Sequence, residues 1–387
     1  MNWRVPFYDL VLGDEEKQAA LSVIESNWLT AGPRIADFES AFSAAMGGEA
    51  QAVAVSSGTA ALHLSLSALG IGPGDEVIVP SLTFVACANV IRYVGAMPVF
   101  ADVTSELDWN VSPADVVAKI TPRTRAIIVV HYAGYSCDMD ELLVLSRKHD
   151  LALIEDCSHA PMGTWKGRPL GTFGDTGCFS LFSNKNMTTG EGGIVISRDQ
   201  QLAERFRTLR SHGITTSTYQ RFKGHAYGYD VVDLGYNYRL DEIRAAIGIE
   251  QLRKLPQFNV RRKERVERYR RLIADKLPRV RVPFVERSTD SSFHIFPVLL
   301  FGDEELRNNT LRGMADRGIQ CSMHYRPIHT FSAYRGVIAN VPVTDRIASS
   351  ILTLPLFPSL SDEQMDLVVE ELRVCLEGGS KADGCGD

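Results

Sequence analysis

Short apolar runs alternate with amphipathic stretches from about residue 50 onward. Runs of this length, separated by helical patterns, are typical of βαβ units in which helices cover a buried, mainly parallel sheet. The pattern therefore predicts an α/β fold with a mainly parallel mixed sheet. The predicted strands cover residues 52–55, 76–79, 97–100, 125–130 and 151–154.

The pattern changes in the last third of the chain. A long helix is predicted over 241–254, Pro256 is expected to interrupt it, and a helical pattern resumes over 260–276 as a bridge between two domains. A strand over 292–300 and helices over 304–317 and 362–376 would build a smaller α+β domain. We expect a large domain over 1–255, a smaller one over 256–377, and a disordered tail over 378–387.

One basic stretch inside the second helical pattern, RRKERVERYRR, could be taken for a nucleic-acid-binding patch. However, Val266, Tyr269 and Ile273 recur at helical spacing, and Glu264 and Glu267 interleave with the arginines. This arrangement favours a solvated helix face with one buried stripe.

Composition narrows the class of protein. The chain has 387 residues, enough for a large α/β domain plus a smaller one. Its 47 acidic and 41 basic residues give a net charge of -6, which argues against general affinity for nucleic acid or anionic membranes. The seven cysteines are scattered and lack a C-x-x-C pair, which favours reduced thiols in a cytoplasmic enzyme over disulfides or a zinc site. The sequence shows neither a signal peptide nor an apolar run long enough for a membrane span, so we expect a soluble protein without a metal.

The segment FSLFSNKNMTTGEGG, from Phe179 to Gly193, is a strand-like run that breaks into a polar turn around Lys185 and then into glycines. An amine that forms a Schiff base must be held on a fixed backbone and kept from bulk water, so that it can be neutral when it attacks. Most lysines in turns are simply solvated. The rest of the chain decides between the two interpretations.

The predicted strand 151–154 continues into a Glu-Asp pair that ends at Asp156, and His159 follows one turn later. Ligands of open α/β sheets bind beyond the carboxyl ends of the strands, so Asp156 would face a site there; it could equally cap the next helix. Beside a Schiff-base lysine, a buried carboxylate would keep the ring nitrogen of pyridoxal phosphate (PLP) protonated. His159 could orient Asp156 or be a structural histidine.

Two further segments follow predicted strands. Ser57, Gly58 and Thr59 enter an alanine-rich helix directly after strand 52–55, which suits a phosphate but also fits an ordinary serine-capped turn. Ser180 could add a hydroxyl to the phosphate. Phe84 could stack on the cofactor ring or belong to the core.

These motifs in this order resemble the DegT/DnrJ/EryC1/StrS family of PLP-dependent sugar aminotransferases. The motifs are Ser-Gly-Thr, Thr-Phe, Glu-Asp-x-x-His, the lysine segment with its Thr-Thr-Gly-Glu-Gly-Gly ending, and Gly-Tyr-Asn-Tyr-Arg. The likeness extends from the Trp-Leu-Thr-Ala-Gly-Pro segment at residue 28 to His-Tyr-Arg-Pro at residue 324, nearly the whole chain.

The resemblance implies a fold type I architecture like that of aspartate aminotransferase, in a homodimer with active sites at the subunit interface. It implies that Lys185 and Asp156 are catalytic, with Lys185 bound covalently to the cofactor and Asp156 paired with its ring nitrogen. The other expected cofactor contacts are Ser57, Gly58, Thr59 and Ser180 at the phosphate, Phe84 and His159 against the ring, and Asn237 reaching the phosphate from the neighbouring subunit.

The resemblance also suggests a substrate site. The loop around His324 and Tyr325 would approach the sugar, and Arg239 and Arg326 would anchor a carboxylate or phosphate. Thr30 and His329 complete the expected substrate contacts.

The implied reaction moves an amino group from an amino acid, glutamate in most of the family, to a nucleotide-linked keto-sugar. Three alternatives stay open. A sugar 3-dehydratase of the same fold would have a histidine in place of Lys185. An aminotransferase could act on a keto-inositol or a free keto-sugar acid, and a non-catalytic sugar sensor could retain the fold without needing both Lys185 and Asp156.

Overall fold

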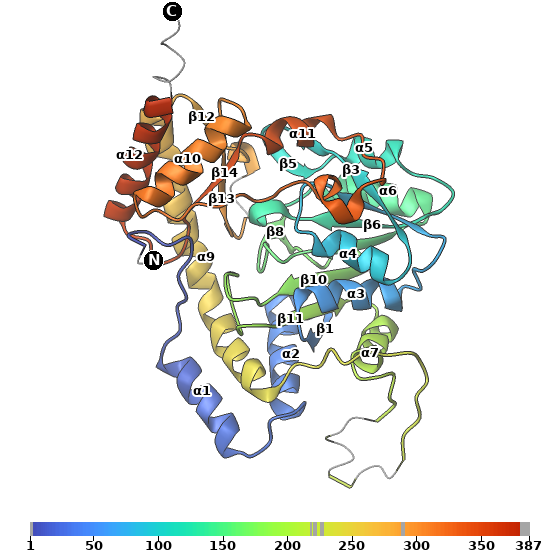
Figure 1. Cartoon of the computed structure of the whole chain (residues 1–387). Coiled ribbons are helices and arrows are strands. Elements are labelled where there is room, and N and C mark those ends of the chain that lie inside the picture. Colours follow the sequence, from blue (N-terminus) through green and yellow to red (C-terminus); the bar gives the residue numbers. More distant parts are fainter. Residues whose placement is uncertain (1–2, 217–218, 220–222, 225–227, 288–290, 380–387) are drawn as a thin grey trace, which may run out of the picture.

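A seven-stranded sheet forms the centre of the computed structural model, which describes residues 3–216, 219, 223–224, 228–287 and 291–379. Its strand order is β1-β11-β10-β7-β6-β2-β3. Only β11 runs antiparallel to its neighbours, so the predicted α/β class with a mainly parallel mixed sheet is confirmed (Figure 1). The strands are β1 (Gln51–Val55), β2 (Glu76–Pro80), β3 (Met97–Ala101), β6 (Thr124–Val130), β7 (Ala152–Asp156), β10 (Thr176–Ser180) and β11 (Gly193–Ser197).

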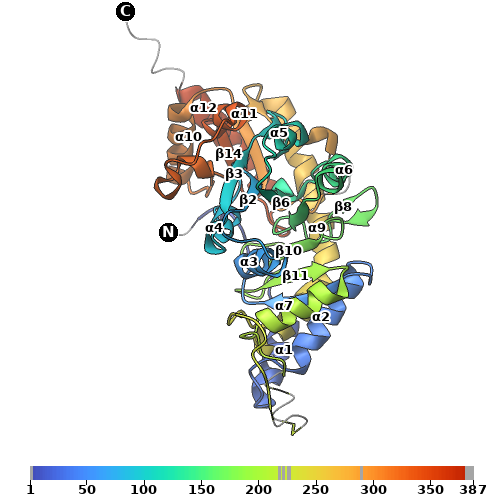
Figure 2. The ribbon, with the colours of Figure 1, turned by 90° about the vertical axis from the view of Figure 1, so that its right-hand side faces the viewer.

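Both faces of this sheet are buried, which explains why its strands are almost continuously apolar. Successive residues of a strand point to opposite faces. In β1, Val53 and Val55 pack into one core, whereas Ala52 and Ala54 pack into the other. Helices α3 (Gly58–Ala68), α4 (Ala86–Tyr93) and α7 (Gln200–Leu209) cover the first face; α2 (Pro33–Ala45), α6 (Met139–His149) and the first half of α9 (Glu242–Lys276) cover the second. Figure 2 shows α3 and α4 on one side of the sheet and α6 and α9 on the other.

A second, three-stranded antiparallel sheet lies nearer the C-terminus. It consists of β12 (Val280–Arg281), β13 (Phe296–Leu300) and β14 (Ile351–Leu354), covered by α10 (Glu304–Asp316) and α12 (Asp362–Gly379). The predicted strand 292–300 is shorter than expected. Phe293 has a φ of 49°, which an extended strand does not allow, and residues 292 and 294 donate instead to the carbonyls of 134 and 133.

The expected interruption at Pro256 is wrong, because α9 continues from Glu242 to Lys276. A proline inside a helix removes one backbone hydrogen bond. Here Pro256 is exposed, while Leu252, Leu255 and Phe258 on either side of it are buried and hold the two halves in line. The helix therefore crosses the predicted domain boundary at 255/256 unbroken, and that boundary stays a prediction.

The basic stretch of α9 buries Val266, Tyr269 and Ile273, as predicted. The arginines of this stretch were expected to be solvated, but Arg262 is buried. It donates to the carbonyls of His294 and Leu356 at 3.0 and 3.1 Å. Burial lowers the pKa of this guanidinium to about 10.

The C-terminal helix is longer than predicted. It includes residues 378 and 379, which the expected tail contained; residues 380–387 lie outside the described part of the chain. None of the helices in the described residues combines the length and apolar sequence needed to cross a membrane. The remaining elements are α1 (Asp14–Glu25), α5 (Pro113–Ala118), α11 (Pro342–Ala348), β4 (Val103–Ser105), β5 (Asp108–Val111), β8 (Thr164–Trp165), β9 (Arg168–Pro169) and short 3₁₀ turns.

Candidate active site

A cavity of about 370 Å³ lies at the carboxyl ends of the parallel strands, where ligands of open α/β sheets bind. Its walls come from the turns after β1, β2, β7 and β10 and from the loop that precedes β14. The predicted site residues that line it are Ser57, Gly58, Thr59, Phe84, Asp156, His159, Ser180, Lys185, His324 and Tyr325. Residues far apart in the sequence thus meet at one edge of the sheet.

Lys185 stands on the turn after β10. Its backbone N–H donates to the carbonyl of Phe182 at 2.9 Å, and the hydroxyl of Thr188 donates to the carbonyl of Leu181 at 3.0 Å, which fixes the turn. Within the described residues, its Nζ makes no hydrogen bond or ion pair. Burial lowers the pKa of the amine from 10.5 to about 8, although the negative charge of Asp156 opposes the shift. The amine is therefore easily made neutral, as a Schiff-base nucleophile must be.

The residue after the lysine anchors this turn to the rest of the molecule. Asn186 is buried, and its amide donates to Asn259 Oδ1 at 2.9 Å and to the carbonyl of Ser292 at 2.7 Å. Its Oδ1 lies 2.9 Å from His294 Nδ1. Because an amide oxygen can only accept, the imidazole is the donor in this last bond. The lysine thus stands on a rigid mount tied to α9.

Asp156 is 5% exposed at the end of β7. Its Oδ1 accepts from the Ser158 backbone N–H at 2.9 Å, and its Oδ2 accepts from the Cys87 thiol at 3.1 Å. The alternative of a helix cap is wrong, because β7 leads into turns and not into a helix. Among the described residues, this buried carboxylate has no ion-pair partner. Burial of an unpaired charge costs free energy unless a cationic group of a ligand lies beside it.

The turn after β1 brings the N-terminus of α3 to the cavity, and a helix N-terminus favours an anion. Ser57 caps α3 by accepting from the Ala60 N–H at 3.0 Å, which leaves the N–H groups of Gly58 and Thr59 at the helix N-terminus. The chain packs so tightly here that a Cβ on Gly193 would lie 2.3 Å from the carbonyl oxygen of Ser57. A Cβ on Gly58 would lie 2.8 Å from the Cβ of Ser180. Glycine at these positions lets the backbone approach closely.

His159 and Tyr325 form one wall of the cavity. His159 Nε2 lies 2.8 Å from the Tyr325 hydroxyl, and the two rings stack at 5.9 Å. Within the described residues His159 does not hydrogen-bond Asp156, so its predicted role in orienting that carboxylate is wrong. Desolvation holds the pKa of His159 well below its usual value, and the ring is neutral.

Phe84 is 56% exposed at the cavity and 6.1 Å from the Tyr325 ring, so the core alternative for Phe84 is wrong.

Several expected substrate residues do not line the cavity. Arg326 is exposed, donates to Thr330 at 2.9 Å and stacks over Phe331. His329 bridges Ser81 at 2.7 Å and Asp345 at 3.1 Å. The side chains of these two residues are thus engaged in local contacts.

The remaining three expected contacts also lie outside the cavity wall. Arg239 donates to the Ser211 hydroxyl at 3.3 Å. Thr30 and Asn237 are exposed. Asn237 was expected to serve a neighbouring subunit, and that role stays a prediction.

Other cavity residues were missed by the sequence analysis. Seven of them lie within six residues of a predicted site residue, so a search of neighbouring positions would have found them, whereas Val130 ends the predicted strand 125–130 and carries no such signal. The missed residues are Leu62, Thr83, Ala86, Val130, Ser158, Phe182, Asn184 and Glu191.

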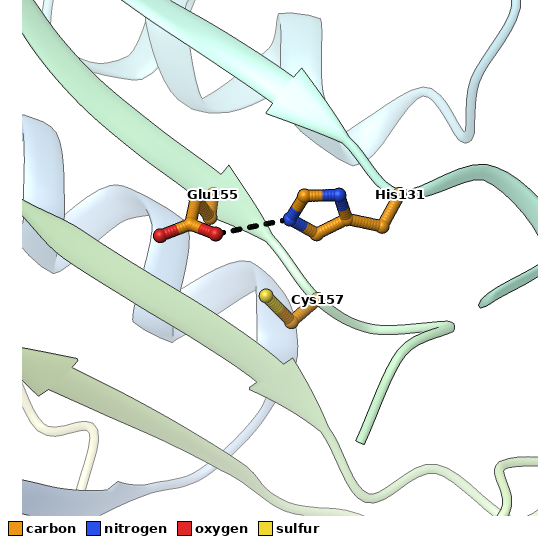
Figure 3. Close-up of side chains that lie close together, drawn as sticks. All are labelled: His131, Glu155 and Cys157. Atoms are coloured by element: carbon orange, nitrogen blue, oxygen red, sulfur yellow. Dashed lines mark hydrogen bonds and ion pairs between the residues drawn. The ribbon is translucent and has the colours of Figure 1, made fainter. Parts of the chain in front are cut away.

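A second group of chemically active side chains lies beneath the cavity. His131, Glu155 and Cys157 are buried with their possible metal-ligating atoms within 4.8 Å of one another (Figure 3). The Glu155 carboxylate already accepts from the N–H groups of residues 171, 173 and 174 at 2.7 to 2.8 Å. His131 Nδ1 accepts from the Cys137 N–H at 3.2 Å, so its Nε2 carries the proton that is donated to Glu155 at 3.1 Å. These atoms are committed to anchoring the 171–174 loop.

The fold and the cavity together define a class of protein. A fold type I sheet with a lysine opposite a buried carboxylate, above a helix N-terminus, is the arrangement of a PLP-dependent aminotransferase. The chain belongs to the DegT/DnrJ/EryC1/StrS aminotransferase family, whose profile matches residues 11–373. It is a PLP-dependent sugar aminotransferase, which excludes the dehydratase and non-catalytic alternatives.

Individual relatives agree over almost their whole length. The chain is 37% identical to the spore coat polysaccharide biosynthesis protein SpsC of Bacillus subtilis, covering 97% of this chain and 98% of SpsC. It resembles the aminotransferase TlmJ of Streptoalloteichus hindustanus with a TM-score of 0.90 and 36% identity, over 97% of this chain and 100% of TlmJ. For the PLP form of Spr1654 from Streptococcus pneumoniae, the TM-score is 0.89 and the identity 30%, over 97% and 99% of the two chains.

The residues present fit this cofactor. The lysine and the carboxylate each lack a charged partner of their own among the described side chains, and the first turn of α3 contains no acidic residue that would repel a phosphate.

Proposed function

We propose that this enzyme transfers an amino group from an amino acid, L-glutamate, to a nucleotide-linked keto-sugar and so supplies an amino sugar for a polysaccharide, another glycan or an antibiotic. The observation that carries the proposal is the pairing of Lys185 with Asp156 across one cavity at the carboxyl ends of the strands. The full-length likeness to a polysaccharide biosynthesis protein supports the sugar. The six cysteines in the described residues are free thiols, in keeping with a cytoplasmic enzyme.

Different residues of the cavity would bind different parts of the cofactor. The N–H groups of Gly58 and Thr59 and the hydroxyl of Ser180 would bind the phosphate, because they lie at the N-terminus of α3. Ser57 acts indirectly, since its hydroxyl oxygen already caps the helix. Asp156 would hold the proton on the ring nitrogen. Phe84 and His159 would bound the ring, and the neutral state of His159 leaves the lysine as the main cation of the cavity.

When bound, PLP supplies a carbonyl that joins amines covalently and a ring that withdraws electrons from the adjoining carbon. Lys185 then has two tasks. Its Nζ would hold the cofactor until the donor amine displaces it, and the freed amine would then take the proton from the donor α-carbon and return it one position further along. A lysine whose pKa is lowered to about 8 can do both, because it exchanges a proton readily near neutral pH.

The subunit interface belongs to the same proposal. We infer a homodimer in which Asn237 of one subunit completes the phosphate site of the other. The exposed position of Asn237 outside its own cavity supports this. The substrate would lie over His324 and Tyr325 at the cavity mouth, and Arg239, Arg326, Thr30 and His329 would contact it only through the partner subunit or after a loop movement.

Spectroscopy of the purified, PLP-loaded protein tests the reaction. Glutamate should convert the yellow protein to a colourless form, and a keto-sugar that is a true acceptor should restore the colour. We would offer nucleotide-linked 3-keto and 4-keto sugars, a keto-inositol and a free keto-sugar acid in parallel, with Lys185→Ala as the inactive control. Recovery of colour with the keto-inositol or the free keto-sugar acid, and not with the nucleotide sugars, would contradict the proposed substrate class.

A further inference from the structure

A buried cysteine holds the carboxylate of the site. Cys87 lies in the first turn of α4, directly after the segment that carries Thr83 and Phe84, and it is fully buried. Its Sγ lies 3.1 Å from Asp156 Oδ2 and 3.7 Å from Thr83 Oγ1. Burial raises the pKa of the thiol, and the nearby charge of Asp156 raises it further. Cys87 is therefore a neutral thiol that donates its proton to the carboxylate, not a thiolate nucleophile.

The two hydrogen bonds of Asp156 fix its orientation. Its Oδ1 is held by a backbone N–H within its own turn, and its Oδ2 is held by the thiol of α4. The terminal torsion of an aspartate is soft, so one bond alone leaves the carboxylate free to turn about that contact. The thiol comes from a different element and supplies the second point that defines the plane of the carboxylate. Each oxygen keeps a lone pair for another donor.

We propose that Cys87 is a positioning residue, whose thiol sets the plane of the Asp156 carboxylate so that it meets the protonated ring nitrogen of PLP. This inference rests on the proposed role of Asp156. A thiol suits the task because it is a weak donor, which orients the carboxylate without competing strongly for its charge. A hydroxyl in its place would preserve the orientation, whereas a methyl group would lose it.

The alternative is that Cys87 only fills the core. Cys137 provides a matched control for this alternative, since it is equally buried and donates an S–H bond at 3.2 Å to a backbone carbonyl, that of Val130, and not to Asp156. Cys87→Ala and Cys137→Ala remove the same atom from the same kind of surroundings. Their melting temperatures report the loss of packing that the two variants share.

The experiment compares Cys87→Ala, Cys87→Ser and Cys137→Ala with the wild-type protein. We expect Cys87→Ala to weaken PLP binding about five- to tenfold, the loss of one hydrogen bond from a weak donor. Cys87→Ser should restore binding to within about twofold, and Cys137→Ala should leave it unchanged. The pH midpoint of the cofactor's visible absorbance should move in Cys87→Ala alone. Equal binding by Cys87→Ala and Cys137→Ala would overturn the proposal.

Infrared spectroscopy of the cofactor-free protein tests the contact itself. The S–H stretching band of Cys87 is obtained by subtracting the Cys87→Ala spectrum. It should move to higher frequency in Asp156→Asn, because the neutral amide oxygen is a weaker acceptor than the carboxylate; an unmoved band would refute the contact. A wild-type protein that binds no PLP would refute the proposed function and the positioning role together. By contrast, normal wild-type binding with an unchanged Cys87→Ala variant would refute only the role of Cys87.

Discussion

The charge on Lys185 should destabilise the cofactor-free fold at neutral pH. The pKa of this amine falls from 10.5 in the unfolded chain to about 8 in the folded one. The unfolded state therefore binds more protons between pH 8 and pH 10.5, so stability rises with pH across that window, and the penalty is fully present below pH 8. At 1.36 kcal/mol per pKa unit, the penalty at pH 7 is at most about 3 kcal/mol, because part of the side chain touches the open cavity.

The variant Lys185→Met removes the charge and keeps a side chain of similar length. We expect it to be more stable than the wild-type protein at pH 7 by up to about 3 kcal/mol, and by about half as much at pH 9.5, where the folded wild type already has a neutral amine. The measurement is urea denaturation of both cofactor-free proteins at the two pH values and at one protein concentration. Taking the difference between Lys185→Met and the wild type cancels the contribution of the other titrating groups to the pH dependence of stability. A stability difference that stays the same at pH 7 and pH 9.5 would refute the reasoning.

Three further outcomes follow from the packing around the site. Gly193→Ala places a Cβ 2.3 Å from the Ser57 carbonyl oxygen, so PLP affinity should fall at least about tenfold when it is measured by equilibrium dialysis. The control Gly72→Ala should bind PLP normally, because its Cβ would have only one atom nearby, at 3.9 Å. Tyr325→Phe leaves His159 Nε2 without its 2.8 Å partner and should lower kcat/KM about tenfold; an unchanged value would show that this bond does not matter for catalysis. Glu155→Ala leaves one buried and two partly buried N–H groups without an acceptor and should cost about 3 to 5 kcal/mol of unfolding free energy in denaturant titrations; a cost under about 1 kcal/mol would contradict its anchoring role.

The sheet was predictable from the sequence because both of its faces are buried. Every predicted strand of the central sheet is present, since a strand buried on both sides must be apolar along its length. Pro256 misled the prediction, because local propensity does not record that Leu252 and Phe258 are buried on either side of it. Phe293 delayed the start of β13 to residue 296, through a backbone conformation that apolar patterning does not reveal.

The cofactor end of the site was predictable for a different reason. Lys185, Asp156 and Gly58 belong to short motifs at strand ends, and the topology of a parallel sheet brings strand ends together. The partner of His159 was not predictable, because Tyr325 reaches it from a loop 166 residues away in the chain. The contact between Cys87 and Asp156 was hidden in the same way, since an α4 cysteine carries no motif that points to a carboxylate.

A covalent bond between Lys185 and the cofactor underlies every role proposed for the cavity. Reduction of the PLP-loaded protein with sodium borohydride, followed by digestion and mass spectrometry, locates the attachment directly. We expect a single pyridoxyl-modified peptide that contains Lys185, and loss of that modification in Lys185→Ala. A modified peptide that contains another lysine, or the same modification in Lys185→Ala, would contradict it.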